Sequence, residues 1–179
     1  METTTPTKWA IDPAHTEIQF KARHMMLTTV TGVFREFEGS IETENEDFSA
    51  AKIKFNANTA SISTGSEQRD GHLRSPDFFD SEQFPELVFE STALHKKNTS
   101  EYTLDGNLTM HGISKPVVLD VELTGRGKDP WGNEKAGFTI SGKLNRKDWG
   151  LLWNTPLEAG GLLVSEEIKL HCEVQVTKV

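Results

Sequence analysis

Apolar and polar residues alternate along much of the chain, and this pattern predicts β-strands. The clearest run covers residues 168–177, where Ile168, Leu170, Val174 and Val176 fall on one face. Because successive side chains of a strand point to opposite faces, the run predicts an antiparallel strand with one buried face. Similar runs predict eight main strands, at about residues 17–24, 32–42, 51–58, 86–95, 101–111, 117–126, 136–146 and 166–178.

Turn-forming residues separate several of these strands and predict hairpins between sequence neighbours. Such segments lie at residues 97–100, 112–116 and 127–133. Residues 65–82 lack the alternation and place a capping residue before helix-forming residues, so we expect a short helical insert there. The fold class is therefore all-β. Eight strands and one insert favour a closed antiparallel barrel or a sandwich, and closure removes exposed strand edges.

Glycines inside the predicted strands bear on the choice between these folds. Gly39, Gly106, Gly125 and Gly142 each interrupt an otherwise good strand pattern. Such glycines mark bulges, sharp bends or the close approach of another group, and a small barrel needs bends of this kind. The alternative is that they mark strand ends. We expect a single domain over residues 9–179 after a disordered tail at 1–8, because no repeat or linker interrupts the chain.

Composition narrows the classes of function. The 179 residues carry a net charge of -8 and no basic stripe, which argues against nucleic acid and against anionic membrane surfaces as main partners. Cys172 is the one cysteine, so an intramolecular disulfide and a cysteine-based zinc site are excluded. No apolar run is long enough for a transmembrane helix. The first residues lack a signal-peptide pattern, so we expect a cytoplasmic location, or a periplasmic one if a leader has been removed.

Five local motifs together resemble one known family. They are WAIDPAHTEIQF at 9–20, RDGHLRSPDFFD at 69–80, LTMHGISKPV at 108–117, GF at 137–138 and RKDWG at 146–150. The chain resembles the YceI-like family of lipocalin-like polyisoprenoid-binding proteins from Trp9 to about Val176. This resemblance implies an eight-stranded antiparallel barrel with a helical cap, an amphiphile with a long prenyl or acyl chain in the lumen, and often a homodimer. Many relatives carry a periplasmic signal peptide, and this chain shows none.

The interior of the barrel is the candidate binding site. A barrel of eight strands either fills with side chains or holds one small ligand, and periodicity does not distinguish these outcomes. Alternation alone favours a plain core, whereas the resemblance implies a lumen for lipid. Under the second interpretation the candidate lipid-binding residues are Ile18, Phe20, Phe37, Phe55, Phe89, Leu108, Met110, Leu119, Val121, Phe138, Ile140, Trp149, Trp153 and Leu170.

A second group of residues raises the possibility of an enzyme or a metal protein. Histidine beside carboxylate can transfer protons, and several histidines can bind a metal. However, no histidine pair has helical metal spacing, and no nucleophile elbow or phosphate loop is present. We therefore expect no catalytic residues, no metal and no cofactor, and we assign the set to turn capping and ion pairing. In this interpretation Arg69 with Asp70, or Arg146 with Asp148, ties loops to the end of the barrel. The set is Asp12, His15, Arg23, His24, Arg69, Asp70, His72, Arg74, Asp77, Asp80, His111 and Asp148.

Three hypotheses follow from these residues. The first is a lipid-binding barrel that acts as carrier, store or sequestering protein. The second is an enzyme or metal protein that uses His15, His24, His72 or His111. The third is an interaction module whose lumen is filled by its own side chains. For the segment 151–153 we keep two interpretations open, closure of the barrel end and a dimer or transient membrane contact.

Overall fold

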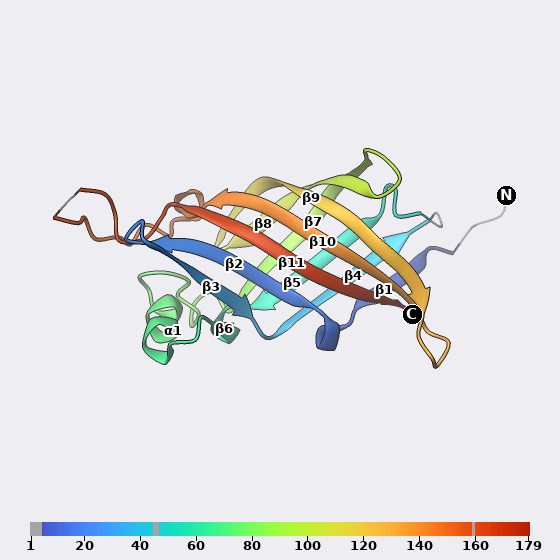
Figure 1. Ribbon diagram of the computed structural model, residues 1–179, viewed down its shortest axis with the longest axis horizontal. Coiled ribbons are helices and arrows are strands. Elements are labelled where there is room, and N and C mark those ends of the chain that lie inside the picture. Colours follow the sequence, from blue (N-terminus) through green and yellow to red (C-terminus); the bar gives the residue numbers. More distant parts are fainter. Residues whose placement is uncertain (1–4, 45–46, 159) are drawn as a thin grey trace.

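The barrel closes through eight antiparallel strands (Figure 1). The computed structural model describes residues 5–44, 47–158 and 160–179. Neighbouring strands pair in the order β1-β4-β5-β7-β8-β9-β10-β11, and β11 pairs again with β1, which confirms the predicted barrel over the sandwich. The strands of this ring are β1 (Thr7–Ile11), β4 (Phe37–Thr43), β5 (Lys52–Asn58), β7 (Glu86–Lys96), β8 (Glu101–Met110), β9 (Ile113–Lys128), β10 (Glu134–Asn145) and β11 (Glu167–Lys178).

Three further strands extend the sheet beyond the ring at one end. They are β2 (Glu17–His24), β3 (Thr28–Phe34) and β6 (Ile62–Ser63). Strand β11 pairs with β2 along its first half and with β1 at its last residues. Strands β1 and β2 therefore lie end to end along the same edge of β11. The short helix η1 (Pro13–His15) separates them, and the Asp12 carboxylate caps it by accepting from the backbone N–H of Ala14.

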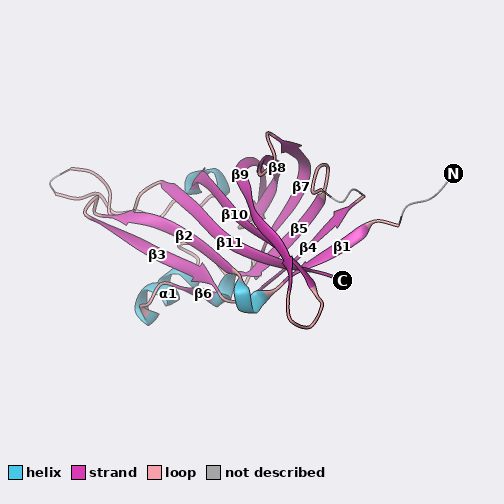
Figure 2. Cartoon of the chain, turned by 45° about the vertical axis from the view of Figure 1, so that its right-hand side comes forward, coloured by secondary structure: helices cyan, strands magenta, loops and turns pink. Residues whose placement is uncertain are grey.

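Short helices complete the structure. Helix α1 (Glu67–Arg74) lies beside β6 at the end of the barrel opposite the β9–β10 turn (Figure 2). The hydroxyl of Ser66 caps α1 by accepting from the N–H of Arg69, as expected for an N-cap serine. The others are η2 (Thr59–Ser61) and η3 (Arg146–Trp149). Among the described residues, no helix has the length and apolar content required to span a bilayer.

The sequence prediction of strands was wrong in three places, of which one is the two-residue strand β6, which was not predicted. The run predicted at 32–42 breaks at Arg35, and its halves β3 and β4 pair with different neighbours. Strand β1 was missed because five residues are too few for a clear period. It begins at Thr7, inside the segment expected as a tail, while residues 1–4 lie outside the described part.

The hairpins from β7 to β11 follow the predicted sequential order. The segment predicted as a turn at 112–116 is mostly strand, because the chain reverses at His111 and Gly112, both at positive φ. The predicted insert at 65–82 contains α1.

The interior glycines mark bulges and close approaches. Gly106 lies opposite a bulge in β7, and a Cβ there would lie 2.4 Å from the Phe89 ring. A Cβ at Gly142 would lie 2.5 Å from the Leu119 side chain. The inward side chains of neighbouring strands thus use the space that these glycines leave.

Candidate ligand-binding cavity

A cavity of about 260 Å³ lies inside the barrel. Every strand except β6 contributes to its lining, as do α1 and the segments 75–85 and 146–166. The side chains that face it are almost entirely apolar. Alternation explains this lining, because one face of each strand turns inward around the whole ring.

Most of the sequence-predicted lumen residues lie around this cavity. The eleven that line it are Ile18, Phe20, Phe55, Phe89, Leu108, Met110, Leu119, Val121, Phe138, Ile140 and Leu170. Residues that line it but were absent from the predicted set include Ile11, Phe34, Phe48, Leu73, Phe78, Phe79, Leu87 and Leu104. Of these, Phe78 and Phe79 could have been predicted from the sequence, because two adjacent aromatic residues inside a charged insert indicate a hydrophobic cover.

The other three predicted residues lie outside the lining. The Phe37 ring packs 6.2 Å from that of Phe55 at the start of β4. Trp149 is buried, and its indole Nε1 donates to the carbonyl of Leu108 at 2.9 Å, so this ring is a structural part of the wall. Trp153 packs 5.5 Å from the Phe78 ring, one layer outside the cavity.

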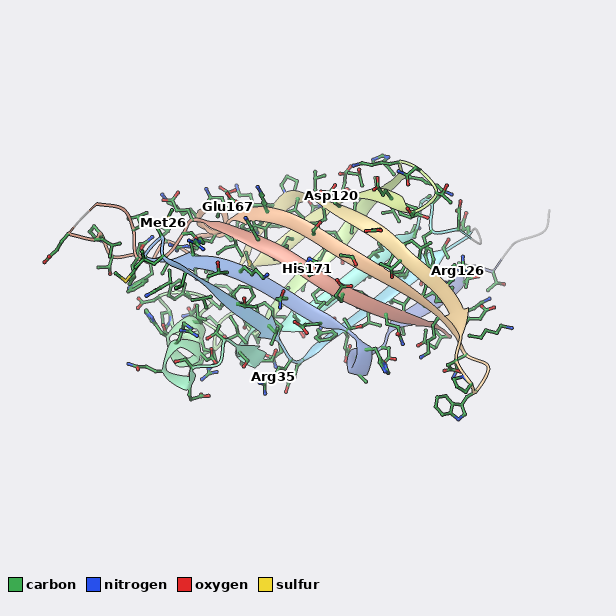
Figure 3. The ribbon with its side chains drawn as sticks, viewed as in Figure 1. Met26, Arg35, Asp120, Arg126, Glu167 and His171 are labelled. Atoms are coloured by element: carbon green, nitrogen blue, oxygen red, sulfur yellow. The ribbon has the colours of Figure 1, made fainter. Side chains whose placement is uncertain are left out.

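An aromatic cluster closes the end of the cavity near the β9–β10 turn. The buried rings of Trp9 and Phe48 lie 5.3 Å apart, and Phe48 meets Phe138 edge to face at 4.9 Å. The Arg126 guanidinium carbon lies 5.5 Å from the Trp9 ring and 5.2 Å from the Phe48 ring. Figure 3 shows Arg126 at this end. We call Trp9, Phe48 and Phe138 the aromatic plug.

The helical insert covers the opposite end. Leu73, Phe78 and Phe79 line the cavity from this side. The buried Asp70 carboxylate accepts from the N–H of Thr64 at 2.8 Å and from its hydroxyl at 2.6 Å. Arg69 donates from Nε to the same hydroxyl at 2.7 Å. Thr64 therefore links both side chains, and the predicted tie between insert and barrel runs through it.

Arg146 fastens a second covering segment. Its guanidinium, in a residue only 4% exposed, donates to the carbonyls of Leu151 at 2.6 Å, Ser165 at 2.9 Å and Val164 at 3.4 Å. The predicted pairing of Arg146 with Asp148 was wrong, because these carbonyls lie around the guanidinium. Desolvation lowers the pKa of Arg146, and the charge of Glu166 partly opposes that shift. Leu151 and Val164 line the cavity beside Arg146.

The histidines of the polar set are dispersed. His15 Nδ1 lies 2.8 Å from the Asp12 carboxylate, and His72 Nε2 lies 2.8 Å from Asp77. The hydrogen bond with His15 lowers the pKa of Asp12, while desolvation opposes the shift. In residues 5–44, 47–158 and 160–179, no group of three or more His, Cys, Asp or Glu side chains could hold a metal ion.

Other members of this set make local contacts. His111 Nδ1 lies 3.1 Å from the carbonyl of Trp149, and Arg74 donates to Glu67 at 2.9 Å. Cys172 is buried in the cavity wall, and burial raises the pKa of its thiol to about 11.

Comparisons with known proteins agree with this architecture. The YceI-like domain family is matched over residues 9–176. A UPF0312 protein of Serratia proteamaculans is 42% identical over 137 residues, which cover 76% of this chain and 71% of that protein. Protein YceI of Salmonella newport is 38% identical over 137 residues, with the same two shares.

Solved structures share the fold. The YCEI protein of Campylobacter jejuni is 30% identical with a TM-score of 0.75, and the match covers 88% of this chain and 90% of that one. A polyisoprenoid binding domain from Saccharophagus degradans has a TM-score of 0.70 at 15% identity, with 96% and 98% covered. The matched motifs, the closed barrel and these relatives place the chain in the YceI-like family.

Proposed function

We propose that the barrel binds a polyisoprenoid or a related long-chain amphiphile in its cavity. In this proposal the protein acts as a carrier, store or sequestering protein. The apolar lining, contributed by nearly every strand, is the observation that carries the proposal. The fold shared with a polyisoprenoid binding domain supports the same class of ligand.

Burial of the chain supplies the driving force. Each buried CH₂ contributes about 0.8 kcal/mol, so one five-carbon isoprene unit contributes roughly 3 to 4 kcal/mol before the entropic cost of binding. Ligand pockets span about 300 to 1,000 Å³, so a cavity of about 260 Å³ is small for a long ligand. A long chain would therefore either widen the cavity or extend beyond it. Few polar groups face the cavity, so we expect selectivity for chain length more than for a particular head group.

Binding fits the geometry better than catalysis does. The carboxylates that contact His15 and His72 belong to Asp12 and Asp77, and none of these four residues lines the cavity. A ligand inside the barrel would therefore not contact them. Proton transfer requires the donor and the acceptor to lie within hydrogen-bond reach of the reacting atom.

Organic extraction of the purified protein followed by mass spectrometry tests the proposal. We expect close to one long-chain amphiphile per protein chain, and we expect the delipidated protein to bind a fluorescent long-chain probe. Val118→Trp is a control for a tryptophan introduced outside the cavity, because Val118 is exposed on β9 and does not line the cavity. This variant should bind the probe like the wild type.

Two results would count against the proposal. Absence of any extracted lipid, together with no probe binding by the delipidated protein, would favour a self-filled barrel. A stoichiometric metal whose removal abolished function would favour the enzyme or metal hypothesis.

A further inference from the structure

Exposed apolar side chains gather at the end of the barrel that carries α1. Met26 is 63% exposed and Leu27 72% exposed at the turn between β2 and β3, next to the partly exposed Met25. Leu152 and Leu162, on the segment that follows η3, are exposed as well. Figure 3 shows Met26 at this end, opposite Arg126. We call Met25, Met26, Leu27, Leu152 and Leu162 the apolar tip.

The backbone of the β2–β3 turn is unfavourable for the residues that occupy it. Met25 and Met26 have φ values of 54° and 60°, and the N–H of Leu27 donates to the carbonyl of His24 at 2.9 Å. Such a two-residue turn with two positive φ values strongly prefers Asn-Gly or similar pairs. Two methionines there cost backbone strain and leave apolar surface in water. The stability of the fold therefore does not account for these residues.

The two segments of the apolar tip are joined to each other and to the cavity wall. The N–H of Met25 donates to the carbonyl of Leu163 at 2.8 Å, and His24 forms a β-bridge with Val164. Val164 lines the cavity, and so does Leu151, the residue before Leu152. The exposed residues Leu152 and Leu162 are thus only one and two positions along the chain from the cavity-lining residues Leu151 and Val164.

The charge of the β2–β3 hairpin is opposite in sign to the net charge of the chain. The chain has a net charge of -8, yet no Asp or Glu occurs between Ile18 and Arg35. Two of the nearby carboxylates are already paired, Glu166 with Lys147 at 3.4 Å and Glu167 with Lys143 at 3.6 Å. Between Ile18 and Phe34 the charged side chains are therefore the cations Lys21 and Arg23, whereas the helical insert at the same end carries Glu67, Asp70, Asp77, Asp80 and Glu82 against Arg69 and Arg74.

The cations of β2 lie just behind the tip. The Arg23 guanidinium donates to the carbonyl of Met26 at 3.1 Å and to the hydroxyl of Thr29 at 3.0 Å. Lys21 is two residues further back. At about 3.3 Å per residue, these positions are roughly 7 to 13 Å from Met25 along the strand. An amphipathic element at a membrane surface buries its apolar side about 5 to 10 Å and keeps its cations at the head groups.

We propose that the apolar tip docks on the surface of a lipid bilayer that contains anionic lipids. Met25, Met26 and Leu27 enter the boundary between head groups and acyl chains, and Arg23 and Lys21 face lipid phosphates. Docking would place the covered end of the cavity at the membrane. A role in ligand transfer rests on the proposed function, whereas docking itself does not. The net charge of the chain argued against an anionic surface, but the cations Lys21 and Arg23 of the β2–β3 hairpin favour one.

The double variant Met25→Asn, Met26→Gly tests the proposal without endangering the fold. Asn-Gly is the preferred pair for this turn, so the variant should fold at least as stably as the wild type. Flotation with phosphatidylcholine vesicles, with and without phosphatidylglycerol, measures docking in the absence of cavity ligand. We expect wild-type binding to the anionic vesicles, decreasing with added salt, and at least about tenfold weaker binding by the variant.

Trp131→Ser is the matched control. Trp131 is 83% exposed at the β9–β10 turn, the opposite end of the barrel, so its replacement should leave vesicle binding unchanged. Equal binding by the double variant and the wild type would overturn the proposal. So would a wild type that floats with neither vesicle. A change in sedimentation mass without a change in flotation would instead assign the tip to a contact between copies. If the docking proposal is wrong and the proposed function is right, the delipidated protein still binds the fluorescent long-chain probe.

Discussion

The two ends of the barrel are closed by different kinds of structure. At the end near the β9–β10 turn, the aromatic plug comes from β1, β10 and the connection between β4 and β5. At the other end, α1 and the segment after η3 cover the cavity, and polar contacts of Asp70 and Arg146 hold them. One closure is built from strands of the ring and the connection between two of them, whereas the other is built from segments outside the ring that pack Leu73, Phe79 and Leu151 against the same core.

This difference indicates where the barrel can open. Removing the plug would disrupt side chains that also stabilise the ring, so its opening approaches global unfolding. The covering segments lie outside the strand ring. Releasing them breaks the hydrogen bonds of Asp70 and Arg146 and uncovers Leu73, Phe78, Phe79 and Leu151, but it leaves the ring paired. We therefore expect the ligand to enter and leave at the end that carries α1.

Phe48→Ala tests the plug and should have the largest effect on stability. Phe48 is buried against Trp9 and Phe138, so its truncation leaves a large void. We expect a loss of about 3 to 5 kcal/mol in the free energy of unfolding, measured by chemical denaturation. Trp131→Ala, which removes an exposed ring at the same end, should change the stability by less than about 0.5 kcal/mol. A small effect of Phe48→Ala would mean that the plug is not part of the core.

Arg146→Met tests the outer cover. The variant leaves the carbonyls of Leu151, Val164 and Ser165 without their charged donor, and we expect a loss of about 2 to 4 kcal/mol. Hydrogen exchange should show that amides in 150–166 lose more protection than those of β9 and β10. Arg126→Met is the control at the plug, where contact with aromatic rings is worth about 1 kcal/mol. Uniform loss of protection along the chain would contradict a separately attached cover.

Asp70→Ala should have an intermediate effect on stability. The variant removes both hydrogen bonds to Thr64 and leaves the Thr64 N–H without its acceptor, for a cost of about 1 to 3 kcal/mol. Asp77→Ala breaks a contact with His72 between side chains that are both partly exposed, so we expect at most about 1 kcal/mol. Unchanged stability with abolished probe binding would instead indicate that Asp70 contacts the ligand.

The sequence predicted the long strands of the barrel better than the segments that close its ends. Alternation identifies which side of a strand faces inward, and it therefore recovered the long strands β7 to β11 and most of the cavity lining. It does not say how far along the barrel a residue lies. Phe37 shares the inward face of β4 with Ile41, yet only Ile41 lines the cavity.

Residues outside the regular strands were the hardest to predict. Phe48 lies in the connection after β4, where no period marks it, and the five residues of β1 are too few for a clear period. Arg146 was recognised as structural, but its partners are backbone carbonyls, two of them 18 and 19 residues away, and no side-chain pattern in the sequence identifies a carbonyl partner. Long-range backbone contacts of this kind become visible only when the chain is folded.

Ile140→Trp should have the smallest effect on stability, and it tests the space between the two ends. Ile140 faces the cavity from β10, so added ring atoms can occupy open volume. Gly142 gives no extra room, because the Leu119 side chain already occupies the space beside it. In an open cavity we expect a change below about 1 kcal/mol and a shorter maximum chain length among bound probes. A packed interior would be overfilled, at a cost of typically about 1 to 3 kcal/mol. Thermal melting of ligand-free protein, combined with a series of probes of increasing chain length, distinguishes these outcomes. A strongly destabilised variant and a wild type that binds no probe would together rule out the carrier proposal.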